Sequence, residues 1–346
     1  MVPTAKRELV HAQDQWSITQ FSAALTNALA GSGPALGIGN ILSTSVSTDV
    51  ALVVTTSGST GTPKEIHLSA AAVTASAKAT NTFLKADAGN SWSLLLPLTH
   101  IAGINVLVRA LLLKSEVLDF RNNSQYTKAD FTAIVPTQLH RALTADHLLL
   151  KHLQDAKAVL VGGAPLAESD KQRAHANGIN VITTYGMSET SGGCIYNGTP
   201  LDGVAVKIVE NIIYLRGPML AQVPLVDGWL KTTDIGRLEN GKLAVFGRAD
   251  DQIISGGEKI SLSVIEQALS ENFESIFLAF AKPDQEWGER LCIATTLELS
   301  QDTISHFLKN RFGGYATPKE IHKVDEIPLI GIGKPDRAKL IERLAK

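Results

Sequence analysis

Between residues 50 and 185, short apolar runs alternate with longer segments that have a helical pattern. The apolar runs are rich in Val, Leu and Ile and end at turn-forming residues, which is typical of buried strands. They are 50–54, 92–96, 131–135, 158–161 and 181–184. The intervening segments predict helices at 69–83, 101–113, 137–145 and 166–177. Strands and helices in alternation favour an α/β domain around a mainly parallel sheet that is buried on both faces.

After residue 190 the segments become shorter and are separated by Gly, Asn and Pro, which predicts a small β-rich region. Its strands are expected at 204–209, 212–216, 228–232 and 242–246. Asn240 and Gly241 predict a hairpin turn before the last of these strands. A polar, glycine-rich stretch follows, and we place a domain boundary there, between residues 249 and 250.

The residues after this boundary predict a compact α+β module. Ser263 and Glu266 have the spacing of a capping box at a helix start. Pro335 is placed to be the first residue of a final amphipathic helix.

Composition and charge exclude several classes of protein. The chain has 346 residues, of which 44% are hydrophobic and 19% charged, as in ordinary globular proteins. Its formal net charge of −2 provides no field that would attract nucleic acid or an anionic membrane. No apolar run reaches transmembrane length, and no signal peptide is evident. Cys194 and Cys292 are too few for a disulfide framework. We therefore expect a cytoplasmic protein without membrane insertion or a nucleic-acid partner.

The segment after the first predicted strand combines hydroxyl side chains, two glycines and a lysine. Its members are Thr55, Thr56, Ser57, Gly58, Ser59, Thr60, Gly61, Thr62, Pro63 and Lys64. Glycines let the backbone approach a polyphosphate closely, while hydroxyls, N–H groups and the lysine bind its oxygens. A proline before Lys64 excludes a Walker A loop. Composition alone leaves open an ordinary polar surface loop.

Six further polar clusters follow this loop in the chain. They are Pro97–His100, Gly162–Ala164, Tyr185–Thr190, Thr233–Asp234, Gly247–Asp250 and Gly331–Lys334. Together with the loop, they resemble the motifs of the adenylate-forming superfamily of acyl-CoA ligases, from about residue 49 to the C-terminus. This resemblance implies an adenylation domain over 1–249, with fewer residues before the loop than usual, and a mobile C-terminal lid domain over 250–346.

The resemblance also implies a reaction in two steps. A carboxylic acid first displaces pyrophosphate from ATP, and the acyl group of the resulting adenylate then passes to a thiol, usually that of coenzyme A. Cations and oriented donors are needed because a carboxylate that attacks a polyanion meets strong charge repulsion. ATP, Mg²⁺ and coenzyme A are therefore the expected cofactors, and a small carboxylic acid is the expected substrate.

By this resemblance, nucleotide contacts fall on residues of the motifs. They are Thr56, Ser57, Gly58, Ser59, Thr60, Gly61, Lys64, Gly162, Gly163, Ala164, Tyr185, Gly186, Ser188, Asp234 and Arg248. Tyr185 would stack on adenine, although a packed core aromatic is the alternative. Asp234 would accept hydrogen bonds from the ribose, in a Thr-Thr-Asp sequence where the family usually has Thr-Gly-Asp. Glu189 matches the magnesium-binding glutamate.

Lys334 matches the lysine that bridges the acid and the α-phosphate, although a lysine outside this context would usually be solvated. Asp250 occupies the hinge position about which the lid domain rotates. After rotation, Gly256 and Gly257 would line a tunnel for the pantetheine thiol. His100 would either stabilise charge on the substrate carbonyl or line the acyl pocket.

Within the superfamily, the chain is most similar to the o-succinylbenzoate–CoA ligases of menaquinone (vitamin K2) biosynthesis. The local matches are 135–139, 159–164, 227–229 and 240–258. This substrate carries a second carboxylate, which needs a cationic or donor-rich partner in an apolar pocket. Arg109 is a candidate, unless it lies on the exposed face of its helix, and Thr137 is a further donor.

Other functions remain open at this stage. A ligase for another aryl or fatty acid would keep the same motifs, as would an adenylation domain that loads a carrier protein. A nucleotide-binding regulator without turnover is a third alternative, and a homodimer is also possible.

Overall fold

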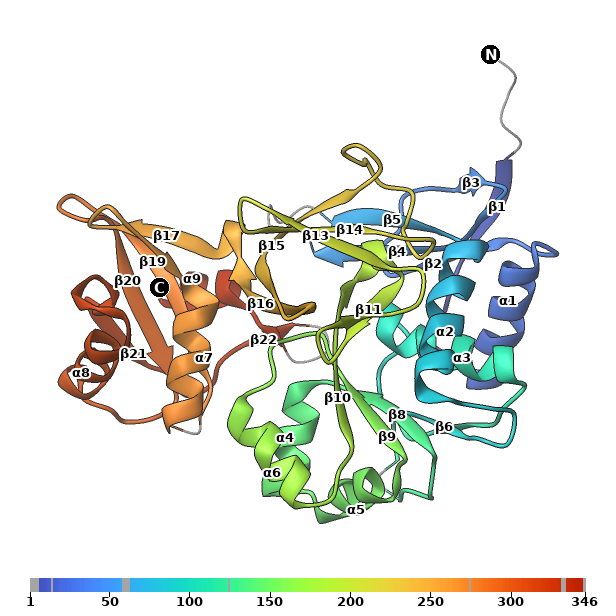
Figure 1. Cartoon of the computed structure of the whole chain (residues 1–346), viewed down its shortest axis with the longest axis horizontal. Coiled ribbons are helices and arrows are strands. Elements are labelled where there is room, and N and C mark those ends of the chain that lie inside the picture. Colours follow the sequence, from blue (N-terminus) through green and yellow to red (C-terminus); the bar gives the residue numbers. More distant parts are fainter. Residues whose placement is uncertain are drawn as a thin grey trace.

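The computed structural model describes residues 6–13, 15–57, 63–123, 125–273, 275–330 and 334–344. Figure 1 shows a larger body, which contains the elements up to β16, beside a smaller body that begins at β17. The predicted α/β architecture with a small α+β C-terminal part is confirmed. The boundary between residues 249 and 250 stays a prediction.

The first sheet contains five strands in the order β3-β1-β2-β4-β5. These are β1 (Lys6–His11), β2 (Ala35–Ile38), β3 (Ser45–Ser47), β4 (Val50–Ser57) and β5 (Pro63–Ser69). Strands β1, β2 and β4 are parallel, and β3 and β5 pair antiparallel at the two edges. Helix α1 (Ile18–Ala30) connects β1 to β2, and α2 (Ala70–Leu84) follows β5.

The second sheet has seven strands in the order β12-β11-β10-β9-β8-β6-β7. Its strands are β6 (Trp92–Leu94), β7 (Val117–Asp119), β8 (Phe131–Ile134), β9 (Ala158–Val161), β10 (Val181–Met187), β11 (Gly192–Tyr196) and β12 (Thr199–Pro200). Strands β7, β6, β8, β9 and β10 run parallel, whereas β11 and β12 are antiparallel to their neighbours.

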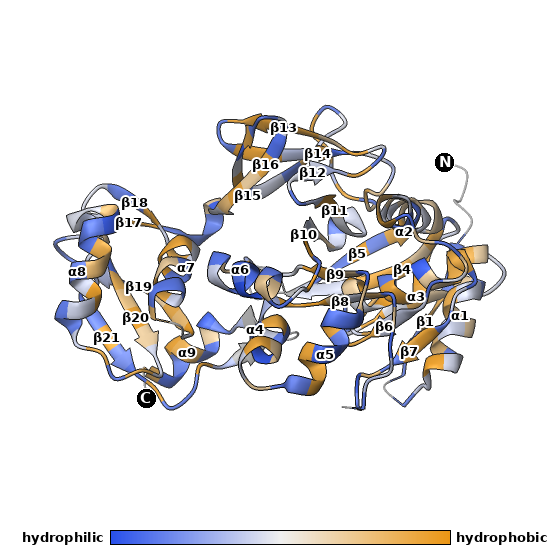
Figure 2. Ribbon diagram, turned by 60° about the horizontal axis from the view of Figure 1, so that its bottom comes forward, coloured by the Kyte–Doolittle hydropathy of each residue, from blue (hydrophilic) through white to orange (hydrophobic). Residues whose placement is uncertain are grey.

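Helices connect the parallel strands and cover them. They are α3 (Ile101–Leu113), α4 (Pro136–Thr144), α5 (His147–Asp155) and α6 (Glu168–Ala176). Strands β6, β8 and β9 are buried at every position, including the polar Ser93 and Thr132 within the first two. Figure 2 shows this apolar colouring on the strands that lie between the helices.

A third, antiparallel sheet has the order β13-β14-β15-β16. Its strands are β13 (Ala205–Val209), β14 (Ile212–Arg216), β15 (Leu230–Glu239) and β16 (Lys242–Arg248). Asn240 and Gly241 form the predicted turn between β15 and β16, with φ of 51° and 77°. Positive φ at both positions is the geometry that favours Asn-Gly in tight hairpins.

The smaller body is a sheet with helices packed on it. The sheet contains β17 (Gln252–Ser255), β18 (Glu258–Ser261), β19 (Phe277–Asp284), β20 (Gly288–Thr295) and β21 (Glu320–Lys323). The helices are α7 (Leu262–Phe273), α8 (Gln301–Phe312) and α9 (Arg337–Leu344). A two-stranded ladder of β22 (Leu329–Ile330) and β23 (Lys334–Pro335) precedes α9.

Two helix starts differ from their predictions. Helix α7 begins at Leu262, and the half-buried Glu266 accepts hydrogen bonds from Arg337 and from the backbone N–H of Ala279 instead of capping the helix. The predicted capping box is therefore wrong. Pro335 lies in β23, and Asp336 caps α9 by accepting a hydrogen bond from the N–H of Lys339. No helix in the described ranges is long and apolar enough to cross a membrane.

Candidate active site

Several of the predicted site residues in the larger body lie at the carboxyl ends of neighbouring parallel strands. His100 is the half-buried N-cap residue of α3, after β6, and the exposed Thr137 lies in the first turn of α4, after β8. Gly162–Ala164 follow β9, and Tyr185 lies near the end of β10. Because parallel strands end at one edge of a sheet, the topology brings these residues to a common edge.

Two glycines at this edge have no room for a side chain. A Cβ atom on Gly162 would lie 2.2 Å from Oγ1 of Thr184 on the adjacent strand. A Cβ atom on Gly186 would lie 2.1 Å from the carbonyl oxygen of Gly192. Gly163 has φ of 86°, where glycine is favoured. The glycines beside Tyr185 therefore expose backbone without side chains, which would leave room for a planar base.

Tyr185, Asp234 and Arg248 form a polar cluster next to these glycines. The hydroxyl of Tyr185 donates to Oδ2 of Asp234 at 2.6 Å. Burial and the nearby Asp234 carboxylate raise the pKa of Tyr185 well above its usual value, so it remains a donor. Arg248 faces the other oxygen of Asp234 at 3.8 Å and donates two hydrogen bonds of 2.7 Å to Asp250. Tyr185 is therefore a hydrogen-bonded residue rather than only a packed core aromatic.

Thr232, the first residue of the Thr-Thr-Asp sequence, is part of this cluster, although the sequence analysis assigned it no role. Its hydroxyl accepts a hydrogen bond from the N–H of Asp234 at 3.0 Å and donates to the carbonyl of Ile213 at 2.8 Å. These bonds fix the Asp234 backbone on β15. Its position two residues before Asp234 was the only sequence feature that pointed to this role, and a threonine at that position can serve many other purposes.

Glu189 lies in the short helical turn Ser188–Thr190, directly after β10. Its side chain is partly exposed, and its carbonyl accepts a hydrogen bond from the N–H of Ala221 at 2.9 Å. No group of three His, Cys, Asp or Glu side chains suited to a metal ion occurs among the described residues. A single carboxylate fits Mg²⁺ that takes its other oxygens from phosphates and water.

The segment 55–64, with its hydroxyl side chains and glycines, includes the ends of β4 and β5, which pair antiparallel. Thr56 pairs with the exposed Lys64, and Ser57 pairs with Pro63. Gly58, Ser59, Thr60, Gly61 and Thr62 lie outside the described residues. Strand β5 contacts the turn that carries Glu189, so the hairpin and the predicted metal ligand are neighbours in space.

The smaller body contains the remaining predicted residues. Lys334 begins β23, where it pairs with Ile330 of β22. Asp250 lies in the turn Ala249–Asp251 that connects the two bodies (Figure 1). Gly256 and Gly257 form the turn between β17 and β18 with positive φ values. Gly256 also packs on Trp287, because a Cβ atom there would lie 2.7 Å from the indole ring.

Arg109 lies inside the protein, and the alternative that it occupies an exposed helix face is wrong. Its side chain is 4% exposed and its guanidinium lies 5.3 Å from the ring centre of Trp92. Nη2 donates to the hydroxyl of Tyr196 at 3.3 Å, whereas Nε has no hydrogen-bond partner among the residues that the structure describes. Burial lowers the pKa of Arg109, yet no carboxylate of the described residues pairs with it. A buried cation without a counter-ion is costly unless a ligand supplies the charge.

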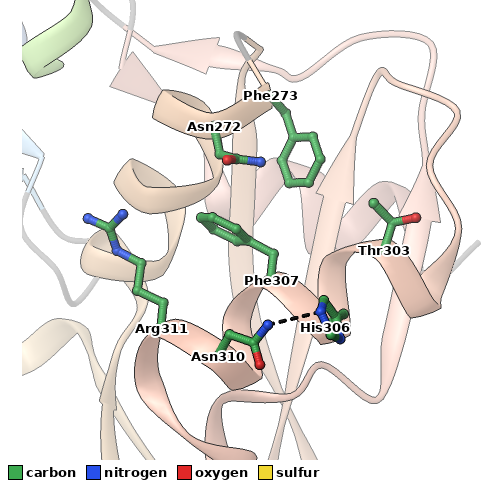
Figure 3. Close-up of a pocket in the computed structure, with 7 residues that line it drawn as sticks. All are labelled: Asn272, Phe273, Thr303, His306, Phe307, Asn310 and Arg311. Carbon is green, nitrogen blue, oxygen red and sulfur yellow. Dashed lines mark hydrogen bonds between the residues drawn. The ribbon is translucent and has the colours of Figure 1, made fainter.

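An open groove of about 430 Å³ lies elsewhere, between α7 and α8 of the smaller body (Figure 3). Phe273 and Phe307 line it, and Asn310 bonds to His306 on its rim. Figures 1 and 2 both show α8 on the side of the smaller body that faces away from the larger one. This groove is therefore separate from the edge that carries Tyr185 and Glu189.

Comparison with known proteins identifies the class to which this site belongs. The chain matches the family model of AMP-binding enzymes over residues 5–216 and that of the AMP-binding enzyme C-terminal domain over residues 275–334. It therefore belongs to the AMP-binding, adenylate-forming enzymes, and the predicted family is confirmed.

Among the relatives, the chain is 38% identical to a probable 2-succinylbenzoate–CoA ligase of Mycobacterium tuberculosis, over 86% of this chain and 85% of the relative. It is 30% identical to the 2-succinylbenzoate–CoA ligase of Escherichia coli, over 76% of this chain and 62% of the relative.

Solved structures agree with this family. A variant of E. coli MenE with bound OSB-AMS has a TM-score of 0.74 and 25% identity, over 96% of this chain and 81% of that chain. The O-succinylbenzoate coenzyme A synthetase (MenE) of Bacillus subtilis, in complex with ATP and a magnesium ion, has a TM-score of 0.75 and 20% identity. That match covers 92% of this chain and 82% of the other.

Proposed function

We propose that the protein is an AMP-forming ligase that joins 2-succinylbenzoate to coenzyme A, a step of menaquinone biosynthesis. The observation that carries the reaction type is the arrangement at one sheet edge of Glu189, Tyr185 and its partner Asp234, next to the β4–β5 hairpin. The choice of acid follows the names of the relatives, 2-succinylbenzoate–CoA ligases, together with the buried, unpaired cation of Arg109.

In the first step, an oxygen of the succinyl carboxylate attacks the α-phosphorus of ATP while the bond to the β-phosphate breaks. In this proposal, Lys334 and the hydroxyl of Ser188 neutralise charge at the α-phosphate, and the segment between β4 and β5 binds the departing pyrophosphate. Mg²⁺ held by Glu189 would supply positive charge to the phosphate oxygens. Asp234 binds the ribose, and Tyr185 with Gly162, Gly163 and Ala164 binds the base.

In the second step, the thiol of coenzyme A attacks the acyl carbonyl carbon, AMP leaves, and the thiol proton passes to solvent. The C-terminal domain rotates about Asp250 between the steps, which replaces Lys334 with Gly256 and Gly257 at the site. His100 lies at the N-terminus of α3, where it lines the acyl pocket or stabilises the carbonyl oxygen. Thr137, at the carboxyl edge of the sheet, and Arg109, which packs on Trp92 at the start of β6, are the two candidate partners of the ring carboxylate.

The test is to incubate the protein with ATP, Mg²⁺, coenzyme A and a panel of aryl and fatty acids, and to measure pyrophosphate and thioester. We expect 2-succinylbenzoyl-CoA to form with the highest kcat/KM of the panel. Thioester from another acid alone would refute the substrate. Transfer only to a phosphopantetheinyl carrier protein would refute the CoA step, and no pyrophosphate with any acid would refute ligase activity.

Two further features belong to this proposal. A substrate set of ATP and coenzyme A favours a cytoplasmic location, which fractionation would test. A homodimer stays a hypothesis, and light scattering of the purified protein would decide between one and two copies.

A further inference from the structure

Two buried side chains donate hydrogen bonds to the residue that follows the turn carrying Ser188 and Glu189. Asn105 of α3 donates through Nδ2 to the carbonyl of Ser191 at 2.8 Å, and Ser76 of α2 donates to the same oxygen at 3.0 Å. Asn105 is 1% exposed and Ser76 is 3% exposed. Helices α2 and α3 both contact β11, which begins immediately after Ser191 (Figure 1).

The carbonyl that they hold belongs to an unusual stretch of backbone. Ser191 has φ of 51° and Gly192 has φ of 97°, so two consecutive residues adopt the left-handed region. A non-glycine residue rarely adopts this conformation without support from its surroundings. Ser191 is fully buried, and its hydroxyl donates to the carbonyl of Met219 at 2.8 Å. Its N–H donates to the carbonyl of Ser188, which closes the turn.

The burial of the Asn105 amide, which makes this hydrogen bond, costs free energy. Asn105 lies in the most apolar part of α3, and its Oδ1 has no partner within the described part of the chain. Because a carbonyl can only accept, the atom of Asn105 that faces Ser191 must be the NH₂ group. A Cβ atom on Gly192 would lie 2.3 Å from that nitrogen, so the fit against the turn is close. An apolar residue would suit the helix better, unless the bond to the turn is needed.

We propose that Asn105 and Ser76 are positioning residues that fix the turn Ser188–Thr190, so that Glu189 presents its carboxylate for Mg²⁺ in the adenylation step. This inference rests on the proposed metal role of Glu189. The two donors act through the Ser191 carbonyl and do not touch the substrate. Their loss should therefore loosen the turn and raise the Mg²⁺ requirement, with thioester formation from supplied acyl-adenylate unchanged.

The test compares Asn105→Leu and Ser76→Ala with Asn81→Leu. Asn81 is a matched control because it is 6% exposed, bonds through Nδ2 to a helix carbonyl, that of Arg109, and also leaves its Oδ1 without a partner. Amide hydrogen exchange of the peptide over 187–192 measures the turn itself. We expect exchange about tenfold faster in Asn105→Leu, a smaller change in Ser76→Ala, and none in Asn81→Leu.

The second readout is the Mg²⁺ concentration that gives half-maximal pyrophosphate release. We expect this concentration to rise about fivefold in Asn105→Leu and by a smaller factor in Ser76→Ala. Ser76→Ala removes only a hydroxyl, so the test remains valid if Asn105→Leu does not fold. Unchanged exchange in both variants overturns the inference, as does faster exchange with an unchanged Mg²⁺ requirement. Glu189→Gln separates the two proposals: a normal Mg²⁺ requirement there refutes the metal role itself.

Discussion

The hydroxyl of Tyr185 lies 2.6 Å from Oδ2 of Asp234, a residue 49 positions further along the chain. This bond joins the β10 edge of the parallel sheet to β15 of the antiparallel sheet. Asp234 is held in two further ways: its backbone N–H donates to the hydroxyl of Thr232, and its carboxylate forms an ion pair with Arg248. The carboxylate is therefore oriented before any nucleotide binds, which reduces the ordering cost of binding.

Tyr185→Phe should weaken ATP binding while it preserves the aromatic face. The loss of one hydrogen bond to the carboxylate predicts a KM for ATP about three- to tenfold higher, with kcat nearly unchanged. Steady-state pyrophosphate release at saturating acid measures both constants. Tyr214→Phe makes the same chemical change on β14 and serves as the control. A fall in kcat with KM unchanged would contradict the role proposed for Tyr185.

Lys334→Ala should separate the two half-reactions. Loss of its charge at the α-phosphate predicts adenylate formation at least about 100-fold slower, since removal of one oriented donor from a reacting centre has effects of this size. Thioester formation from supplied acyl-adenylate and coenzyme A should stay within about threefold of the wild type, because that step does not use the lysine. Lys339→Ala, an exposed lysine of α9, is the control. Equal losses in both half-reactions would contradict the assignment.

The sequence predicts β8 and β9 well because every position of these two parallel strands is buried, whereas the half-buried β7 was not predicted. The strand predicted at 158–161 and the helix predicted at 101–113 have the observed bounds. Residues 6–47 were not assigned any element, although Ser17 and Gln20 form a capping box at the start of α1 and Gly31 ends that helix. Those local signals were present, but the strands on either side of α1 are short.

Errors occur where tertiary contacts override a local pattern. Ser263 and Glu266 have the spacing of a capping box, but Glu266 turns inward to Arg337, which is 71 residues away. Arg109 could not be placed from periodicity, because its partners Trp92 and Tyr196 come from other elements. Asn105 belongs to no recognisable motif, and its hydrogen bond to the carbonyl of Ser191 could be identified only from the structure. The motifs thus identified the residues proposed to bind the ligand, whereas the residues that support them have no recognisable sequence pattern.

Arg109→Met should reduce activity in a way that depends on the acid. If the guanidinium binds the ring carboxylate, its removal leaves that carboxylate unpaired in an apolar pocket, and kcat/KM for 2-succinylbenzoate should fall about 100-fold or more. The same variant should stay within about threefold of the wild type with 3-benzoylpropionate, which lacks the ring carboxylate. Initial rates of AMP release with both acids test this. Equal losses for the two acids would indicate a structural role for Arg109.

Glu266→Gln should remove part of the pH dependence of stability. Burial raises the pKa of Glu266 from 4.5 to about 7, with a further contribution from the nearby Asp251 and an opposing one from Arg337. The folded protein thus binds this proton more tightly than the unfolded chain between about pH 4.5 and 7. Stability must therefore decrease as the pH rises through this window, by on the order of 2–3 kcal/mol.

Glutamine keeps the oxygen that accepts hydrogen bonds from Arg337 and Ala279, but it does not titrate. The free energy of unfolding of the wild type, minus that of Glu266→Gln, should therefore decrease from pH 4.5 to 7 and stay level above that range. Urea unfolding at several pH values, followed by tryptophan fluorescence, measures this difference. Glu271→Gln makes the same chemical change on the same helix and serves as the control. If the difference rises with pH, Arg337 outweighs burial, and the carboxylate stabilises the folded protein in its ionised form.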